Sequence, residues 1–550
     1  MPAWLIALDR HFPIRYLAWL GCALLALLGL FTEVAFHQGA GWALLGAVGV
    51  VTGLHDVRQT RHAILRNYPV IGHLRFLLEF IRPEMRQYFI EGDTEAQPFS
   101  RQQRSIVYQR AKGEPDKRPF GTQLDVHAEG YEWINHSLQP TRLDSHDFRI
   151  TIGPRCAQPY AASEFNISAM SFGALSANAI LALNGGARRG GFMHDTGEGS
   201  ISSHHRVHGG DLVWEIGSGY FGCRHGDGTF DAEMFARHAC ERQVKLIELK
   251  LSQGAKPGHG GVLPGPKVTA EIAAARGVAE GVDCVSPAAH SAFSTPVEML
   301  QFIARLRELS GGKPTGFKFC IGHPWEWFAI CKAMLETGLR PDFIVVDGGE
   351  GGTGAAPLEF TDHVGAPLQE GLLLVHNTLV GLGLRDEIRL GAAGKIISAF
   401  DIARAMALGA DWCNSARGFM FALGCLQAQT CHSGDCPTGV ATQDPLRQKA
   451  LDVGSKTERV WRFHQNTLEA LKELVQCAGL RHPGEISAAH IVRRVAGDEV
   501  RLLANHLAFI PPGALLATMR GERPWPHKVY EVYWPLARAG SFQPAQGAQH

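Results

Sequence analysis

The stretch Phe343-Ile-Val-Val-Asp-Gly-Gly-Glu-Gly-Gly-Thr-Gly354 joins a short apolar run to a loop that contains five glycines. A run of this length with β-branched side chains is typical of a buried strand in a parallel sheet. Glycine loses more backbone entropy on folding than any other residue, so a glycine-rich loop is expected where backbone amides must approach a ligand. The stretch therefore predicts a strand whose carboxyl end meets a bound molecule.

The same alternation of apolar runs and helical stretches continues on both sides of this strand, which is the pattern of a parallel α/β fold. We expect strands at Phe165–Ala169, Phe192–Asp195, Lys245–Leu251, Asp283–Ser286, Gly316–Cys320, Phe343–Asp347, Ile388–Ala392 and Trp412–Ala416. Eight strands favour a closed (β/α)8 barrel, the TIM barrel, over an open sheet. In such a barrel, the loops that follow the strands hold the ligand.

The overall composition is that of a globular protein with a large core, because 45% of the 550 residues are hydrophobic and 19% are charged. The 53 basic residues balance 53 acidic ones, so no net field favours nucleic acid as a partner. The 12 cysteines are scattered, apart from one motif discussed below.

The N-terminus predicts a transmembrane helical hairpin. Tyr16–Thr32 and Gly39–Leu54 carry no charge, and each is close to the lower limit of about 17 residues for a spanning helix. Arginines flank the pair at positions 10, 15, 58, 61 and 66, which predicts that both flanks and the catalytic domain face the cytoplasm at the cell inner membrane. The alternative is a buried helical hairpin. A reducing cytosol would keep the thiols free to bind metal.

We divide the chain into four parts on this basis. Residues 1–60 form the hairpin, and residues 61–160 form a helical and irregular linker that packs on the barrel. Residues 161–445 form the barrel domain, and residues 446–550 form a C-terminal helical extension. Within the linker, the apolar spacing from Ile71 to Ile81 predicts an amphipathic helix that ends near Pro83.

The loops after the predicted strands contain the candidate ligand-binding and catalytic residues. Ala169, Met170 and Ser171 open a loop of small residues that lets backbone amides approach a planar ring or an anion. Lys250, Gln253 and Lys256 form a polar, cationic group among glycines, and a lysine there can hold the N1/O2 edge of a reduced flavin. The alternative for a single lysine is simple exposure to solvent. Glu198 is a lone carboxylate in the loop after Phe192–Asp195.

The loops after the last two strands predict a phosphate site. Gly394-Lys395 and Ala416-Arg417 occupy the positions at which barrels bind phosphate, and a helix begins at the second loop. A flavin mononucleotide fits such a site, and a sugar phosphate fits it almost as well.

Three cysteines, Cys425, Cys431 and Cys436, follow in a C-x5-C-x4-C pattern. An odd number of thiols argues against disulfides, and the paired C-x2-C spacing of zinc sites is absent from the motif. Three thiolates suit a 3Fe–4S cluster. Inert buried cysteines are the alternative.

Several of these stretches together resemble the FMN-binding domain of glutamate synthases, and the linker around Asn67–His73 is similar to that of short, stand-alone members. The matching stretches are Met170–Ser176, Thr196–Gly199, Gln253–Gly258, Gly348–Gly354 and Cys425–Pro445. The resemblance implies an oxidoreductase that carries FMN on a (β/α)8 barrel with a 3Fe–4S cluster beside it. The implied reaction is the reduction of 2-iminoglutarate, formed from 2-oxoglutarate, to L-glutamate.

The resemblance also assigns residues to roles. The cluster ligands would be Cys425, Cys431 and Cys436. The catalytic and substrate residues would be Lys250, Glu198, Gln253, Lys256 and Arg276. The FMN residues would be Ala169, Met170, Ser171, Lys250, Gly348, Gly349, Gly351, Gly352, Thr353, Gly394, Lys395, Ala416 and Arg417.

The chain departs from the family pattern in three respects. Met1-Pro2 leads directly into the hairpin, so we expect no glutamine amidotransferase domain, and no G-x-G-x-x-G motif stands out for NADPH. We therefore expect a ferredoxin or an NAD(P)H-oxidising subunit as the electron donor. Val262 and His259 replace residues that are common near the substrate carboxylate. Two alternatives follow: an N-methylglutamate synthase-like enzyme acting on another imine or amino acid, and a membrane-tethered flavin and iron–sulfur electron-transfer subunit.

Overall fold

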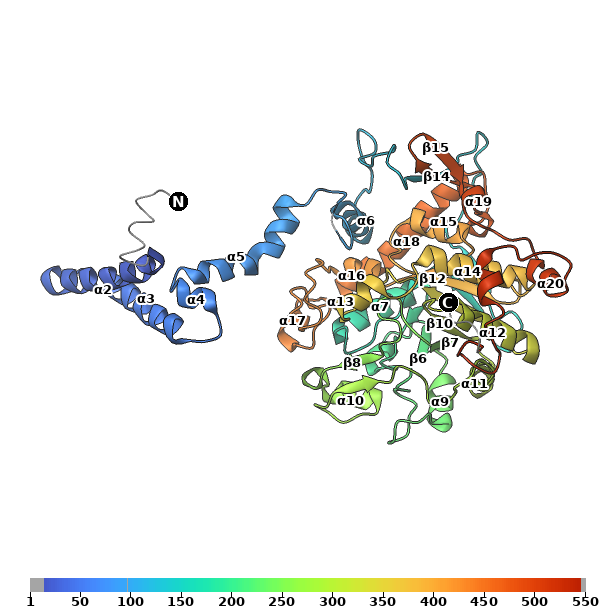
Figure 1. Cartoon of the computed structure of the whole chain (residues 1–550), viewed down its shortest axis with the longest axis horizontal. Helices are drawn as coiled ribbons and strands as arrows, with labels where there is room; N and C mark the ends of the chain where they lie inside the picture. Colours follow the sequence, from blue (N-terminus) through green and yellow to red (C-terminus); the bar gives the residue numbers. More distant parts are fainter. Residues whose placement is uncertain (1–13, 96, 546–550) are drawn as a thin grey trace. The chain divides into compact units, whose positions relative to one another are not determined.

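The computed structural model describes residues 14–95 and 97–545. The chain divides into two compact units, one before and one from Gln97 (Figure 1).

The first unit begins with two long helices that pack against each other, α2 (Leu17–Phe36) and α3 (Ala40–Arg58). Their close contact depends on glycine. A Cβ atom added at Gly29 would lie 2.3 Å from the backbone nitrogen of Ala43, and one at Gly46 would lie 2.3 Å from that of Ala26. Small residues at helix contacts are common in membrane helices because they let the backbones approach. The Glu33 carboxylate closes the turn by accepting hydrogen bonds from the amides of Gly39 and Ala40.

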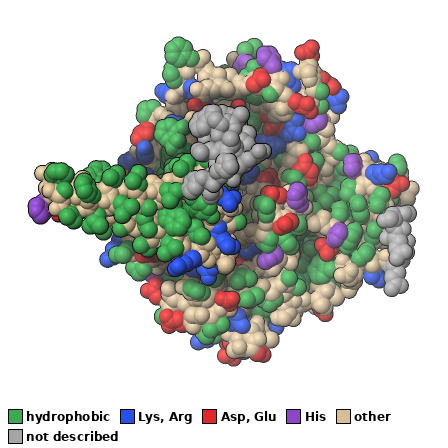
Figure 2. Space-filling view, turned by 60° about the vertical axis from the view of Figure 1, so that its left-hand side comes forward, with side chains coloured by type: hydrophobic (Ala, Val, Ile, Leu, Met, Phe, Trp, Pro, Cys, Tyr) green, Lys and Arg blue, Asp and Glu red, His purple; other side chains and the backbone are tan. Residues whose placement is uncertain are grey.

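The outer surfaces of α2 and α3 are strongly apolar (Figure 2). Leu27, Val34 and Leu44 are 66%, 76% and 68% exposed. Ile14–Phe36 and Ala40–Arg58 are both long and apolar enough to cross a membrane, by length and composition.

The remaining helices of this unit are α4 (Ala63–Asn67), α5 (Gly72–Met85) and the π-helical turn η2 (Arg86–Ile90). The buried Asp56 carboxylate, near the end of α3, accepts a hydrogen bond from the Val70 amide and contacts His73 Nε2, each at 2.9 Å. The amphipathic helix expected from Ile71 is present as α5, and it continues two residues beyond Pro83.

The second unit is built on a closed barrel of eight parallel strands surrounded by helices (Figure 1). In order around the barrel the strands are β4 (Phe165–Ile167), β5 (His194–Asp195), β6 (Leu212–Ile216), β7 (Val244–Lys250), β10 (Thr315–Phe319), β11 (Phe343–Asp347), β12 (Arg389–Ala393) and β13 (Trp412–Ser415). The helices between them include α7 (Ala177–Gly190), α8 (Ser203–Arg206), α9 (Ala232–Ala239), α11 (Pro296–Leu309), α12 (Pro324–Thr337), α13 (Leu358–His363), α14 (Leu368–Gly381) and α15 (Ala399–Ala407). The expected barrel is confirmed.

The barrel interior has an apolar lower layer and a charged upper layer. The β-hairpin formed by β2 (Arg149–Ile152) and β3 (Tyr160–Ser163) contributes Ile152 and Ala162 to an apolar cluster with Phe343, Val345 and Trp412. Side chains alternate along a strand, so the residue two positions after an inward-facing apolar residue also points into the barrel, closer to the carboxyl end of the strand. These residues are charged: Asp195, Glu215, Glu248, Lys318 and Asp347.

One expected barrel strand is wrong and another was missed. Asp283–Ser286 corresponds to β9 (Cys284–Ser286), which pairs antiparallel with β8 (Gly261–Leu263) in a two-stranded sheet outside the barrel. The strand that takes the third place in the barrel is β6. Its sequence is Leu-Val-Trp-Glu-Ile, and Glu215 interrupts the apolar run that would have marked it as a buried strand.

The segment between β7 and β10 carries β8, the turn η3 (Gly265–Lys267), α10 (Ala270–Arg276) and β9. On another side, α16 (Arg417–Leu423) follows β13 and packs against α18 (Val453–Cys477) and α6 (Arg101–Lys112). The short helix α17 (Pro445–Lys449) lies before α18. The rest of the described chain adds the sheet of β1 (Glu132–Ile134), β14 (Ile491–Ala496) and β15 (Glu499–Leu502), the turn η4 (Pro483–Glu485), and helices α19 (Leu503–His506), α20 (Ala514–Met519) and α21 (Lys528–Tyr533).

Candidate active site

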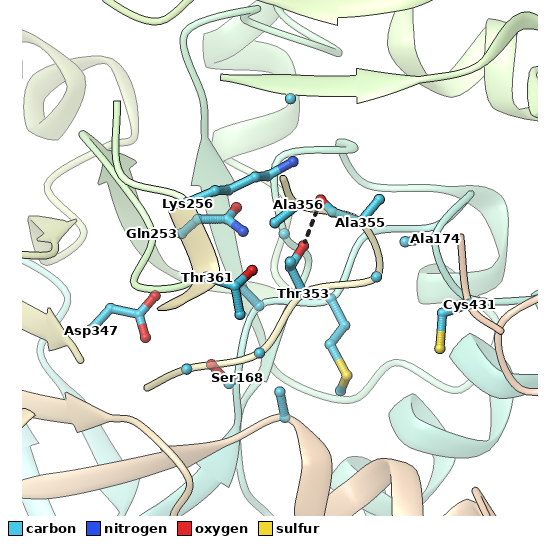
Figure 3. A pocket seen from close by; sticks show the side chains of 18 of the residues that line it. Ser168, Ala174, Gln253, Lys256, Asp347, Thr353, Ala355, Ala356, Thr361 and Cys431 are labelled. Atoms are coloured by element: carbon cyan, nitrogen blue, oxygen red, sulfur yellow. Dashed lines mark hydrogen bonds between the residues drawn. The ribbon is translucent and has the colours of Figure 1, made fainter. Parts of the chain in front are cut away.

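A cavity of about 1780 Å³ lies at the carboxyl ends of the barrel strands. It is larger than the roughly 300–1,000 Å³ of a pocket for one small ligand. The loops after β4, β5, β7, β11, β12 and β13 line it, together with part of the cysteine motif. Figure 3 shows Gln253 and Lys256 on one side of the cavity and Cys431 on the other.

The cationic side of the cavity is arranged around Glu198. The Lys250 ammonium lies 3.3 Å from the Glu198 carboxylate and donates a hydrogen bond of 2.7 Å to Gln253 Oε1. Burial alone would raise the pKa of Glu198, but Lys250, Arg276 and Lys256 outweigh it and lower that pKa. Burial lowers the pKa of Lys256. One carboxylate is therefore held ionised among three cations, which leaves this side with a net positive charge.

Arg276 reaches this side from the last turn of α10 and is 5% exposed. Its guanidinium donates a hydrogen bond of 3.1 Å to the carbonyl of Phe172 and lies 5.2 Å from the centre of the Phe221 ring. Its buried Nε has no hydrogen-bond partner within residues 14–95 and 97–545. A buried donor without a partner is costly, so this arginine suits an anionic ligand in the cavity.

The opposite end of the cavity has the features of a phosphate site. Gly394 and Lys395 follow β12, and Ala416 and Arg417 follow β13, as expected from the sequence. Arg417 donates a hydrogen bond of 2.7 Å to the Thr353 carbonyl, which joins this end to the glycine loop after β11. A Cβ atom at Gly352 would lie 2.4 Å from Arg417 Nε, so a side chain there would displace the guanidinium from this position.

Two loops meet between these ends. The Asp347 carboxylate accepts a hydrogen bond of 2.9 Å from the Gly254 amide. A Cβ atom at Gly254 would lie 1.8 Å from the carbonyl oxygen of Gly348. The glycine at 254 therefore fixes the loop with Gln253 and Lys256 against the loop after β11.

The expected cofactor residues line the cavity with one exception. Ala169, Met170, Ser171, Lys250, Gly349, Gly351, Gly352, Thr353, Gly394, Lys395, Ala416 and Arg417 are at its wall. Gly348 is not, since it packs against Gly254 and the start of α14. The five expected catalytic residues all line the cavity.

The three cysteines lie in one loop that begins at the end of α16. Cys431 lines the cavity, and Cys425 and Cys436 are buried behind it. Burial raises the pKa of Cys425 to about 11, although the Gln427 amide donates to its sulfur and lowers that pKa. Burial would raise the pKa of Cys436 too, but the Ala441 amide and the Thr438 hydroxyl lead the hydrogen bonds that lower it on balance. Amide donors to sulfur are a known feature of iron–sulfur sites, so this donor set fits a cluster held by three thiolates.

The residues expected to depart from the family pattern also face the cavity. Val262 lies on β8 and is 49% exposed, while the His259 ring makes an edge contact with Phe360 at a centroid distance of 5.0 Å. A Cβ atom at the neighbouring Gly261 would lie 2.5 Å from the Glu198 carboxylate. Both departures are thus close to the cationic side of the cavity.

The charged floor of the cavity was not predicted from the sequence. Glu215, Lys318 and Asp347 line it from below, and Glu248 and Asp195 lie behind them. The Lys318 ammonium contacts the Glu215 carboxylate and lies 3.2 Å from that of Glu248. Single charged residues inside apolar strands, as in Gly-Phe-Lys318-Phe and Val-Trp-Glu215-Ile, were the available signal.

Comparison with known proteins identifies relatives of the whole barrel unit. The conserved region in glutamate synthase matches residues 134–481. The glutamate synthase large subunit-like protein YerD of Bacillus subtilis (strain 168) is 39% identical over 482 residues, which cover 80% of this chain and 91% of that protein. The archaeal glutamate synthase (NADPH) of Methanocaldococcus jannaschii is 34% identical over 351 residues, 64% of this chain and 65% of that protein. Among solved structures, a mandelate oxidase with (S)-4-hydroxymandelic acid has a TM-score of 0.41 and 14% identity, over 73% of this chain and 90% of that one.

The contact at Gly254 predicts that a larger residue at this position destabilises the protein. Gly254→Ala would place a methyl group against the Gly348 carbonyl and should lower the free energy of unfolding by about 1–3 kcal/mol. Gly322→Ala is the matched control, because its Cβ meets only a flexible glutamate at 3.9 Å, and it should change stability by less than about 0.5 kcal/mol. Denaturant unfolding of the two variants measures both, and equal stabilities would contradict the role of Gly254.

Proposed function

The chain belongs to the glutamate synthase family, and we propose that it reduces 2-iminoglutarate, formed from 2-oxoglutarate and ammonia, to L-glutamate at this cavity. One observation carries the proposal: a single cavity is lined by a phosphate-type site, by a cationic wall and by Cys431. Bound FMN would supply the two-electron reduction, and a 3Fe–4S cluster would pass electrons to it from a donor protein such as a ferredoxin or an NAD(P)H-oxidising subunit.

In this proposal the residues of the chain bind and orient the reactants. Gly352, Thr353, Gly394, Lys395 and Arg417 would hold the FMN phosphate, because backbone amides and two cations converge there. The loop of Ala169, Met170 and Ser171 would lie against the ring system. Cys425, Cys431 and Cys436 would hold the cluster at the cavity wall.

The substrate would lie on the cationic wall. Arg276 lines the cavity with its guanidinium, and a guanidinium can bind a carboxylate through two parallel hydrogen bonds. Lys256 and Lys250 offer two further cations within the same wall, and Glu198 keeps them oriented by its charge. Lys250 lies at the strand end between this wall and the floor, where it can also face the edge of the flavin ring.

A second function has support from two residues. His259 and Val262 line the cavity beside Glu198, where they change the shape and polarity of the wall that would receive a carboxylate. They favour an N-methylglutamate synthase-like reaction on another imine or amino acid. A membrane-tethered electron-transfer subunit without turnover of its own is a third possibility, motivated by the apolar hairpin.

The reaction is tested by anaerobic assay of the purified holoprotein with dithionite, 2-oxoglutarate and ammonium. We expect L-glutamate to form, and Arg276→Lys to raise the KM for 2-oxoglutarate about tenfold or more because the paired hydrogen bonds are lost. Arg520→Ala, on an exposed arginine paired only with Glu522, is the control and should leave KM unchanged. Flavin that is reoxidised by a different imine but not by 2-oxoglutarate and ammonia would favour the second function. Electron transfer that survives Lys250→Met, with no turnover of either substrate, would favour the third.

The iron–sulfur assignment and the FMN assignment can be tested separately, by measuring the iron and the flavin bound to purified variants. Cys431→Ser should remove the iron from the purified protein and leave flavin bound, because the substitution removes a proposed cluster ligand and keeps every residue proposed to hold the FMN phosphate. Arg417→Ala should weaken flavin binding by about 10- to 100-fold, the effect of one charge-assisted hydrogen bond, and leave the iron in place. Iron that persists unchanged in Cys431→Ser would show that the three-thiolate interpretation is wrong.

We also propose that α2 and α3 span the inner membrane with the barrel unit in the cytoplasm, supported by their length, their apolar outer surfaces and the flanking arginines. The full chain should stay with the membrane fraction after an alkaline carbonate wash. Protease added to inside-out vesicles should cleave the barrel unit. Release of the chain by carbonate, or protection of the barrel unit in such vesicles, would contradict the proposal.

A further inference from the structure

The floor of the cavity contains more buried charge than one lysine can balance. Asp195, Glu215 and Glu248 place carboxylate oxygens within 4.8 Å of one another, and all three residues are at most 2% exposed. Such a group of carboxylates can hold a metal ion, but the Lys318 ammonium, itself 3% exposed, already pairs with Glu215 and Glu248. Three carboxylates share a single cation.

Geometry alone requires that these groups hold an additional proton. Three ionised carboxylates and one ammonium would leave a net charge of about −2 among side chains that are at most 3% exposed, and like charges this close do not all ionise. Asp347, from the next strand, adds a fourth carboxyl group at the cavity floor, where burial raises its pKa although Lys318 and Lys250 act to lower it.

The pKa shifts of these groups agree with an excess of carboxyl groups over cations. Burial raises the pKa of Asp195 well above its usual range, and Glu248 adds to the effect. Burial also raises the pKa of Glu248 to about 7, against the opposing influence of Lys318. The carboxylates, led by Glu215, outweigh burial at Lys318 and keep it protonated.

The groups are layered between the protein interior and the cavity. Glu215 and Lys318 line the cavity wall, whereas Asp195 and Glu248 lie behind them on β5 and β7. A proton held by the rear carboxyl groups can thus reach the cavity through Glu215, with Lys318 holding the charges in place.

We propose that Asp195, Glu215, Glu248 and Lys318 form a proton store that supplies the proton consumed when the ring system bound above them is reduced. This inference rests on the proposed function for the identity of that ring system. Two electrons come from the external one-electron donor. The O–H bond of a carboxyl group in the store breaks, a bond to hydrogen forms on the reduced ring, and water in the cavity returns a proton to the carboxylate.

The first test needs no activity. A carboxyl group whose pKa is raised in the folded state binds more protons there than when unfolded, so its stabilising contribution is lost as pH rises through the folded pKa. From about pH 5 to about pH 8 the Tm of the wild-type protein should fall relative to that of Glu248→Gln, which is neutral throughout. Parallel Tm profiles would overturn the proton store. Asp195→Asn provides a second variant with the same expectation if Glu248→Gln fails to fold.

The second test follows the rate of flavin reduction by dithionite against pH in the holoprotein. The wild-type rate should decline as pH rises through about 7, and this inflection should disappear in Glu248→Gln. Glu164→Gln is the matched control: burial raises the pKa of Glu164 to about 8, but this residue precedes β4 and does not line the cavity. Its profile should keep the inflection.

An unchanged inflection in Glu248→Gln would overturn the proton store even if glutamate forms. A purified protein without flavin would instead contradict the proposed function, and the Tm profiles would still decide whether the store exists.

Discussion

The ion cluster around Lys318 is the constraint on which the site depends. A lysine that is 3% exposed inside a barrel must be paired, and β6 and β7 supply the Glu215 and Glu248 carboxylates to it. Removing one partner from a buried pair of this kind costs about 3–5 kcal/mol, because the remaining charge has no water to solvate it. The cluster therefore fixes where the apolar filling of the barrel ends and where the polar cavity begins.

The position of that boundary also explains why the loops above it are rich in glycine. A ligand that rests on a charged floor must be surrounded by backbone, because bulky side chains on the loops would fill the space. Gly254 lies against the Gly348 carbonyl and Gly352 lies against Arg417, and neither contact leaves room for a Cβ atom. The loops are held to one another by these contacts and by the hydrogen bond from Arg417 to the Thr353 carbonyl.

Sequence reasoning located the loops of the site but not its floor. The strands before Gly348 and before Gly394, and the loops with Lys250 and Arg417, were predictable because apolar runs alternate with glycine and cationic residues. The pairing of Glu215 with Lys318 was not predictable: Glu215 interrupts the apolar run of β6, Lys318 lies within a strand that was expected, and only the closed barrel brings the two together. For the same reason β6 was missed and β9 (Cys-Val-Ser) was expected in the barrel, although β9 pairs with β8 outside it.

The distribution of charge between the two ends of the cavity determines the orientation in which the proposed ligands would bind. The cationic wall has three positive residues and Glu198, a net charge of about +2 that matches a dicarboxylate. The other end offers Lys395 and Arg417, which match a phosphate group. The floor between them is acidic, so an anion would be repelled from the middle and drawn to either end. In the proposed function, the residues at the phosphate end would hold the flavin phosphate, and the cationic wall would hold the dicarboxylate on the other side of the floor.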